Sequence, residues 1–190
     1  MEPLPATKGF ALFDTALGSC GIAWGLNALT GVQLPEANEQ ATRARMRWRF
    51  PQVSELGPES APPPFVAHAV EDIVALLRGE PNVPRDLANI ALDWTGVAPF
   101  NRRVLELART IAPGQTLTYG EMAGRLGEPG AARAVGQALG HNPFAPVVPC
   151  HRVLAAGSAS GGFSANGGVS TKLRMLLAER AAFGAPGLFD

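Results

Sequence analysis

The sequence predicts an α+β protein, with a small antiparallel sheet at the start and short helices in the second half. Three apolar runs, Phe10–Asp14, Cys20–Trp24 and Thr30–Leu34, are separated by glycine and asparagine, as in strands joined by hairpins. Apolar residues then recur at helical spacing over residues 65–78 and 100–111. A sheet followed by helices that share its core is typical of this class.

Two helices are predicted between the sheet and the middle of the chain. Pro35 and the acidic residue after it are start signals for a first helix that ends near Phe50. The second helix is the periodic segment over residues 65–78. We then expect a turn at Pro81–Pro84 and a strand over Leu87–Leu92, where the chain is apolar for a short stretch.

The first predicted helix carries four arginines near its end: Arg43, Arg45, Arg47 and Arg49. Cations suit this end of a helix because the helix dipole is negative there. A solvated helix face and a basic patch for a polyanion both fit the pattern.

A segment with glycine and proline, Trp94–Pro99, is interpreted as a linker. A chain of 190 residues holds one large or two small domains. We therefore predict domains over residues 1–94 and 95–190.

Two short helices with a tight turn are predicted after the helix over residues 100–111. Thr118 is the expected N-cap of the first, and Glu121 completes a capping box. The second runs from Ala131 to Leu139. Such a pair resembles a helix-turn-helix unit, whose second helix meets DNA. A packed helical hairpin without a nucleic-acid role fits the same pattern.

The remaining chain is predicted to turn at Asn142-Pro143 and to end in a helix. Residues 155–168 are rich in glycine, alanine and serine, which indicates a loop able to fold closely over a ligand. The final helix is expected over Lys172–Ala182, with Glu179 near its end.

The charges are balanced overall but not along the chain. There are 16 basic and 16 acidic residues, which argues against a uniformly basic nucleic-acid binder. Residues 1–99 hold seven basic and eleven acidic residues, whereas residues 100–190 hold nine and five. A basic surface in the second half would attract DNA, although ordinary scatter of charge also accounts for this difference.

The cysteine and histidine content predicts free thiols and no metal site. Cys20 and Cys150 lie far apart, and the first residues lack the basic start and apolar core of a signal peptide. We expect free thiols in the reducing cytoplasm, with one disulfide as the alternative. No Cys-x-x-Cys or His-x-x-x-His spacing occurs, so no metal is expected, and His68 is interpreted as a core or boundary residue. No stretch is long enough to span a membrane.

The run Pro149-Cys150-His151-Arg152 is the strongest candidate for chemistry. A thiol becomes a good nucleophile as a thiolate, and a nearby base or cation favours that form. A cysteine between apolar residues is also common as a small buried side chain. The run therefore leaves a reactive site and a packing role open.

The second half resembles the O6-alkylguanine-DNA alkyltransferases, the methylated-DNA–protein-cysteine methyltransferases. The resemblance covers roughly residues 95–183, and the N-terminal hairpin carries it weakly. The matching motifs are Tyr119, the run Ala132-Arg133-Ala134-Val135-Gly136, Asn142-Pro143, Pro149-Cys150-His151-Arg152-Val153, Gly161-Gly162-Phe163-Ser164, Lys172 and Glu179. It implies a ribonuclease H-like N-terminal part and a winged-helix-like C-terminal part.

The resemblance implies a set of catalytic residues around one acceptor. Cys150 would accept the alkyl group, and His151 would act as its base through a water. Glu179 would orient and polarise His151, while Asn142 would hold the turn. Arg152 is expected to anchor the turn rather than to activate the thiol.

The resemblance also implies residues that contact DNA. Tyr119 would bind the target nucleotide, and Arg133 would enter the duplex and fill the space that the flipped base leaves. Ser164 would lie near the alkylated oxygen. The remaining expected contacts, to phosphate or through close backbone approach, are Asn101, Gly120, Ala134 and Gly136.

The implied function is suicidal DNA repair. The alkyl group of O6-alkylguanine, with O4-alkylthymine as a second candidate, would pass to Cys150 after nucleotide flipping. No cofactor is expected, the partner is double-stranded DNA with an alkylated guanine, and the protein is expected to be a monomer. A lesion-binding module without repair is the main alternative, although such a module has no need of a thiol at Cys150. A cysteine hydrolase fits less well, because adjacent Cys150 and His151 rarely converge on one atom.

Overall fold

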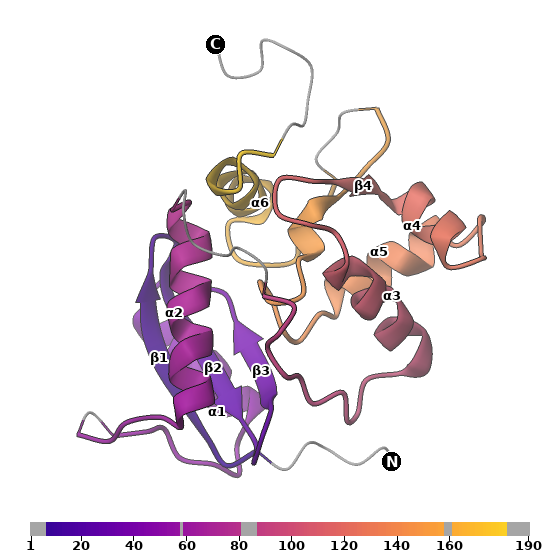
Figure 1. Ribbon diagram of the computed structural model, residues 1–190. Helices are drawn as coiled ribbons and strands as arrows, with labels where there is room; N and C mark the ends of the chain where they lie inside the picture. The colour runs from indigo at the N-terminus through magenta and orange to yellow at the C-terminus, as the bar shows by residue number, and fades with distance from the viewer. Residues whose placement is uncertain (1–6, 58, 81–86, 158–160, 182–190) are drawn as a thin grey trace. The chain divides into compact units, whose positions relative to one another are not determined.

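The computed structural model describes residues 7–57, 59–80, 87–157 and 161–181, which form two compact units (Figure 1). The first unit holds the described residues up to Val97 together with Pro143–Val147. The second unit holds Ala98–Asn142 and the described residues from Val148 onward. The assignment of residues 1–94 and 95–190 as separate domains stays a prediction.

The sheet of the first unit has the predicted three strands. They are β1 (Gly9–Thr15), β2 (Gly18–Trp24) and β3 (Leu29–Gln33), antiparallel in the order β1-β2-β3. In the first hairpin Phe13 lies opposite Cys20. The sheet and the helices around it confirm the predicted α+β class.

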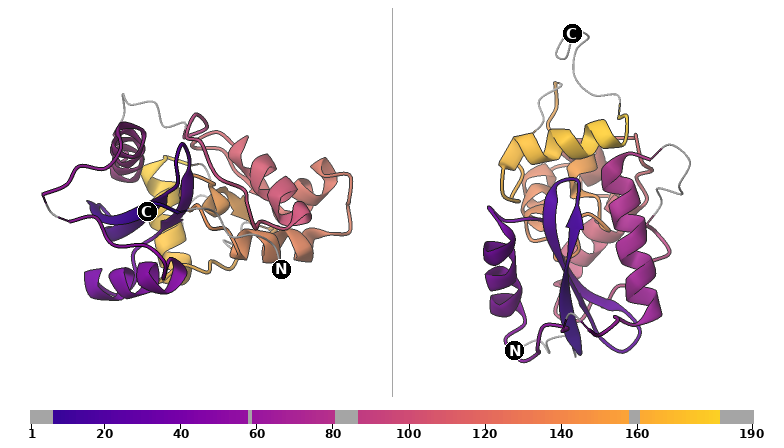
Figure 2. Two further views of the ribbon diagram at one scale, coloured as in Figure 1. Left: turned by 90° about the horizontal axis from the view of Figure 1, so that it is seen from below. Right: turned by 90° about the vertical axis from the view of Figure 1, so that its left-hand side faces the viewer.

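The two helices of this unit cover opposite faces of the sheet (Figure 2). They are α1 (Glu39–Arg49) and α2 (Pro64–Arg78). A Cβ atom on Gly21 would lie 2.5 Å from Cγ of Met46, so α1 can approach β2 closely only because this residue is glycine. α1 begins later than predicted from Pro35, because Asn38 supplies the capping side chain to the amide of Ala41 at 2.9 Å.

The four arginines of α1 do not act as one surface. Arg43 and Arg47 pair with Glu55, and Arg49 donates to the main-chain oxygens of Val32 and Pro143. Arg45 lies over the ring of the exposed Trp48. Neither a solvated face nor a basic patch describes all four.

Two predictions about the first unit are wrong. Leu87–Leu92 forms no strand, because the chain turns within the run and makes a single β-bridge to the sheet, from Leu92 to Leu29. His68 is exposed rather than at the core, because the buried stripe of α2 follows Val66, Ala69 and Ile73 on another face. The predicted turn at Pro81–Pro84 lies outside the described residues.

The second unit is mainly helical, as predicted. Its helices are α3 (Pro99–Arg109), α4 (Tyr119–Arg125), α5 (Ala132–Gly140) and α6 (Gly168–Ala178). A short helical turn, η1 (Cys150–Arg152), leads into β5 (Val153–Leu154), which pairs in parallel with β4 (Leu117–Thr118).

The local sequence signals in the second unit predicted the start of α4 correctly but not the start of α6. The capping box of Thr118 and Glu121 is confirmed in full, with hydrogen bonds in both directions. α6 begins at Gly168, four residues before the predicted start at Lys172, and Glu179 is its C-cap rather than part of its last turn. Glycine is a weak helix former, which concealed this start.

No helix among residues 7–57, 59–80, 87–157 and 161–181 combines the length and the apolar character that crossing a bilayer requires.

Candidate active site

Cys150 is the first residue of a buried turn, and the side chain of Asn142 is bonded to the backbone just before that turn. Cys150, His151 and Arg152 form η1 and are all buried, and the sulfur-bearing residue is 8% exposed. The amide of Asn142 donates from Nδ2 to the main-chain oxygen of Val148 at 2.8 Å, just before the turn. The backbone N–H of Cys150 donates to the same oxygen at 2.9 Å. These two hydrogen bonds to one oxygen fix the backbone that carries the thiol.

Glu179 joins the two residues that follow Cys150. Its Oε1 lies 2.8 Å from Nε2 of His151 and accepts from Arg152 at 2.8 Å, and its Oε2 accepts from Nε of Arg152 at 2.8 Å. Arg152 also donates to the main-chain oxygen of Ile111. Arg152 thus anchors the turn, as predicted, by holding it to α6 and to the end of α3.

The protonation states in this network follow from burial and pairing. Burial raises the pKa of Glu179, but hydrogen bonds from His151 and Arg152 outweigh it and lower the pKa to about 2. Burial lowers the pKa of His151, and the opposing effect of its hydrogen bond to Glu179 does not offset this. The carboxylate is ionised and accepts the proton on Nε2, so the neutral ring keeps its lone pair on Nδ1. This Nδ1 has no hydrogen-bond partner among the described residues.

Cys150 is a protonated thiol in the resting protein. Burial raises its pKa, while the hydrogen bond from Asn142 and the charge of Lys172 act against that rise. Lys172 is fully buried, and its Nζ donates to the main-chain oxygen of Val153 at 2.7 Å. Burial lowers the pKa of Lys172 to about 8. The thiol therefore needs a base at the moment of reaction.

Cys150 opens onto a pocket of about 540 Å3 within the second unit. This volume suits a small organic group such as a nucleobase. We call it the Cys150 pocket, and its lining comes from α4, α5, η1 and the glycine-rich loop: Tyr119, Ala132, Arg133, Gly136, Gln137, Leu139, Gly140, Cys150, Gly162, Phe163 and Ser164.

Tyr119 forms one wall of the Cys150 pocket between two glycines. A Cβ atom on Gly136 would lie 3.7 Å from its ring, and one on Gly161 would lie 3.0 Å from it. The hydroxyl of Tyr119 donates to the main-chain oxygen of Gly162 at 3.5 Å. The flat ring is held by the close approach of α5 on one side and of the loop on the other.

Several known proteins that are similar to this chain are methyltransferases. A family model described as the DNA binding domain of 6-O-methylguanine DNA methyltransferase matches residues 99–181. A methylated-DNA–protein-cysteine methyltransferase of Mycobacterium bovis is 33% identical over 172 residues, which are 90% of this chain and 92% of the relative. That of Methanothermobacter thermautotrophicus is 35% identical over 84% of this chain and 78% of the relative. The chain belongs to the methylated-DNA–protein-cysteine methyltransferases. The predicted resemblance is confirmed.

Solved structures of the methyltransferase family agree with this assignment. The crystal structure of Mycobacterium tuberculosis O6-methylguanine methyltransferase has a TM-score of 0.68 and 32% identity, over 96% of this chain and 99% of that one. The structure of the M. tuberculosis OGT in complex with DNA has a TM-score of 0.69 and 31% identity, over 90% and 92% of the two chains. Similarity thus extends over both units of this methyltransferase.

The structure brings most of the predicted site residues of the methyltransferase together. Cys150, His151, Glu179 and Asn142 belong to the turn and its network, and Tyr119, Arg133, Gly136 and Ser164 line the Cys150 pocket. Asn101, Gly120 and Ala134 lie on α3, α4 and α5 but are not among the described lining residues. Their contact with DNA stays a prediction.

Sequence reasoning assigned no role to Lys172, although its charge acts on the methyltransferase's thiol. A lysine is almost always solvated, so its identity alone gives no signal of burial. Its spacing does, because Lys172 shares the buried stripe of α6 with Met175 and Leu176, three and four residues on.

Proposed function

We propose that this protein repairs DNA by moving the alkyl group of O6-alkylguanine onto Sγ of Cys150. One observation carries the proposal: a thiol faces a pocket of nucleobase size and is followed by a neutral, buried imidazole whose Nδ1 bonds to no described residue. The relatives that cover most of this chain are methyltransferases that act on methylated DNA, and a similar chain has been solved with DNA. The protein is thus a DNA-binding methylated-DNA–protein-cysteine methyltransferase.

The target nucleotide must leave the base stack before it can reach Cys150. Extrusion costs a few kcal/mol, and less for a damaged base that pairs poorly. Arg133 is exposed at the first turn of α5 and lines the Cys150 pocket. We assign it the role of entering the duplex in place of the flipped base, which offsets part of this cost.

The transfer itself is an in-line displacement with a defined path for the proton. The thiol proton passes through a water to Nδ1 of His151, and Nε2–H of the resulting imidazolium stays hydrogen-bonded to ionised Glu179. The thiolate attacks the alkyl carbon, an S–C bond forms, and the C–O6 bond breaks with its electron pair moving to O6. The guanine anion then takes up a proton and becomes normal guanine.

Hydrogen-bond donors near O6 would stabilise the leaving group as its charge develops. Burial raises the pKa of Tyr119, so its hydroxyl keeps its proton and remains a donor. Ser164 lines the same pocket and is the second candidate. We assign both to the leaving group, without a cofactor or a metal.

The product is a thioether, which has no simple route back to a thiol, so each molecule reacts once. We extend the substrates to O4-alkylthymine, whose alkylated oxygen presents the same leaving-group chemistry. Phosphate and backbone contacts are assigned to Asn101, Gly120, Ala134 and Gly136. We place a monomer in the cytoplasm, where a reducing environment would keep Cys150 free.

A lesion-binding module that recognises the damaged base without repairing it is the competing function. It would use the Cys150 pocket and Arg133 but would leave the thiol unchanged. The buried Glu179–His151 pair favours repair, because base recognition alone requires no proton acceptor behind the thiol.

Peptide mass measurement separates these functions. After incubation with a duplex oligonucleotide containing O6-methylguanine, the peptide with Cys150 should carry one methyl group. Cys20 provides an internal control, because it is buried and its pKa is raised to about 12, so its peptide should stay unmodified. Cys150→Ser should bind the duplex and gain no methyl group. An unmodified Cys150 peptide after complete incubation of the wild type would exclude repair.

A further inference from the structure

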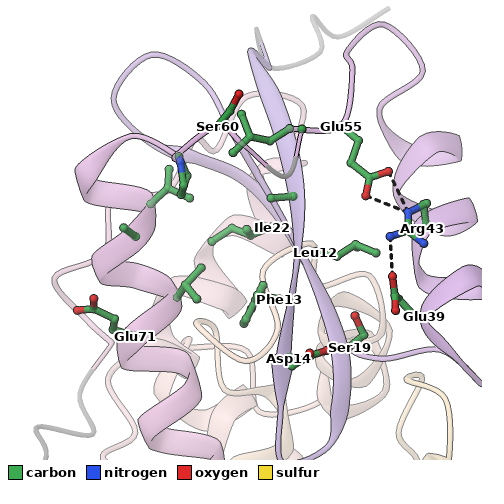
Figure 3. A pocket seen from close by; sticks show the side chains of 17 residues that line it. Leu12, Phe13, Asp14, Ser19, Ile22, Glu39, Arg43, Glu55, Ser60 and Glu71 are labelled. Carbon is green, nitrogen blue, oxygen red and sulfur yellow. Dashed lines mark hydrogen bonds and ion pairs between the residues drawn. The ribbon is translucent and has the colours of Figure 1, made fainter.

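One edge of the sheet in the first unit is open along β1. β1 is an outer strand that pairs with β2, and α1 and α2 cover the two faces (Figure 2). A groove of about 720 Å3 follows this edge between the two helices (Figure 3). We call it the β1 edge groove and define it by Leu12 and Asp14 of β1, Glu39 of α1, and Val66, Val70 and Glu71 of α2.

The edge already accepts one short extended segment at its start. Leu56 donates its backbone N–H to the oxygen of Phe10 at 2.8 Å, and Glu55 and Phe10 form a parallel bridge. The backbone polar groups of Phe10 therefore face outward, and alternation along the strand gives Leu12 and Asp14 the same direction. Among the described residues, no segment pairs with these two positions.

The two walls of the β1 edge groove differ in chemistry. The wall on the α2 side is apolar at Val66, Ala67 and Val70 and carries one carboxylate, that of Glu71. Four carboxylates and one guanidinium make up the charged lining: Asp14, Glu39, Glu55, Glu71 and Arg43. Arg43 pairs with Glu55 and Glu39, as Figure 3 shows, and Arg47 also pairs with Glu55. The negative charge of the groove therefore comes mainly from Asp14 and Glu71.

We propose that the β1 edge groove binds an extended segment of a partner protein by strand addition, with apolar and basic side chains in alternation. Its backbone would bond to Leu12 and Asp14, its apolar side chains would face α2, and its lysines or arginines would face the acidic side. Strand addition takes affinity from main-chain bonds and specificity from alternate side chains.

The charge of the groove also selects against a second copy of this chain. Two such edges brought together would face each other with like charges, which opposes pairing. A basic segment instead gains from the same carboxylates. The occupant is therefore a partner segment of opposite charge.

A labelled peptide of alternating valine and lysine, with blocked termini, provides the direct probe. Fluorescence anisotropy should show saturable binding, and hydrogen exchange at the amides of Leu12 and Asp14 should become slower. A peptide of the same sequence with methyl groups on alternate amide nitrogens should bind at least about tenfold more weakly, because it has lost main-chain donors. A valine–glutamate peptide should not bind. Equal affinity of the methylated peptide would reduce the contact to ion pairing and overturn the proposal, as would a lack of saturable binding.

A pair of variants on α2 locates the binding site. Ala67→Lys places a basic side chain inside the groove and should weaken binding of the valine–lysine peptide by at least about tenfold. His68→Lys adds a lysine at the neighbouring exposed position outside the groove and should change affinity by less than about twofold. Equal effects of the two variants would overturn the site. So would a wild-type dimer in sedimentation that Ala67→Lys dissociates, because the occupant would then be a second copy. Alkyl transfer by both variants serves as a check on folding and is independent of the proposal.

Discussion

The ring nitrogen Nε2 of His151 lies 2.8 Å from Oε1 of Glu179, and both side chains are closed off from solvent. The same carboxylate is held by Arg152, also at 2.8 Å, so its negative charge is shared between a neutral ring and a cation. Burial, which lowers the pKa of His151, and to a lesser extent the charge of Arg152 explain how a histidine beside a buried carboxylate can stay neutral at rest. Glu179 fixes the tautomer of His151 without forcing a proton onto it.

Glu179→Gln should therefore slow alkyl transfer. The amide keeps the shape of the carboxylate but loses the charge that stabilises the imidazolium of His151. We expect the single-turnover rate to fall by about 10²-fold or more. Rapid-quench kinetics with an alkylated duplex over a range of pH measure this rate.

The matched control is Glu121→Gln, an exposed change in the same unit in which glutamine can still complete the capping box. It should react at the rate of the wild type. A folded Glu179→Gln protein with an unchanged pH–rate profile would refute the coupling of Glu179 to His151.

The pH–rate profile of the reaction with free O6-alkylguanine base should have an upper limb near pH 8 that Lys172 causes. Its pKa is lowered by burial to about 8, so it is charged below that pH and neutral above it. Its positive charge favours the Cys150 thiolate, so that support is lost as the pH rises through 8. Lys172→Met should remove this limb and slow the reaction by about tenfold or more.

The control for Lys172→Met is Arg174→Met, at an exposed position of α6. Thermal unfolding should show both variants folded, because methionine fills the buried position of Lys172 and removes its buried charge, whereas Arg174 is exposed. If Lys172→Met left the high-pH limb in place, the limb would belong to another group.

Arg133→Ala should separate duplex repair from the chemistry at Cys150. The exposed guanidinium at the start of α5 has its assigned role only when a base leaves the stack. Repair of an alkylated duplex should fall by about tenfold to hundredfold, whereas the reaction with the free base should change by less than about twofold. Gln137→Ala, at an exposed pocket position one turn further along α5, is the control. Equal losses on both substrates would exclude a finger role for Arg133.

Gly161→Ala should disturb the wall that Tyr119 forms. Gly161 has a φ of +69°, and its added Cβ would lie 3.0 Å from the ring of Tyr119 and 3.2 Å from its hydroxyl. The strained backbone costs about 1 kcal/mol, and the displaced ring should slow the reaction with free base by about tenfold. Gly157→Ala has a similar φ of +74° but meets no atom within 4 Å, so it isolates backbone strain from the clash. Equal rates for the two variants would contradict the role of Tyr119.

Local signals predicted the fold where one short segment determines the outcome. The capping box at Thr118 and Glu121 depends on four consecutive residues, and the structure has every bond that it requires. The apolar run Leu87–Leu92 carries the composition of a strand, but a strand needs a partner along its length. In the structure the run forms a single β-bridge, between Leu92 and Leu29, which its composition could not reveal.

The resemblance to the family predicted the residues of the site, whereas residue types alone predicted only part of them. His151 and Glu179 are 28 positions apart, so no local pattern joins them, and the family motif supplied the pairing. Lys172 was part of the family motif but received no role, because a lysine is expected in water, whereas here it is buried and its charge acts on Cys150. Burial of a charge depends on packing that a sequence does not state.

The five residues Pro143–Val147 belong to the first unit, although they interrupt the sequence of the second. Phe144 is 1% exposed there and packs edge-on against Trp94 with ring centroids 5.3 Å apart. A shortened chain that starts at residue 98 would keep Phe144 but lose Trp94, and an aromatic side chain would be left in water. The segment from residue 98 onward, which contains Cys150, therefore depends on the first unit to bury Phe144. Recombination at residue 98 would succeed only if the donor of the first unit supplies an aromatic side chain that packs against Phe144, as Trp94 does here.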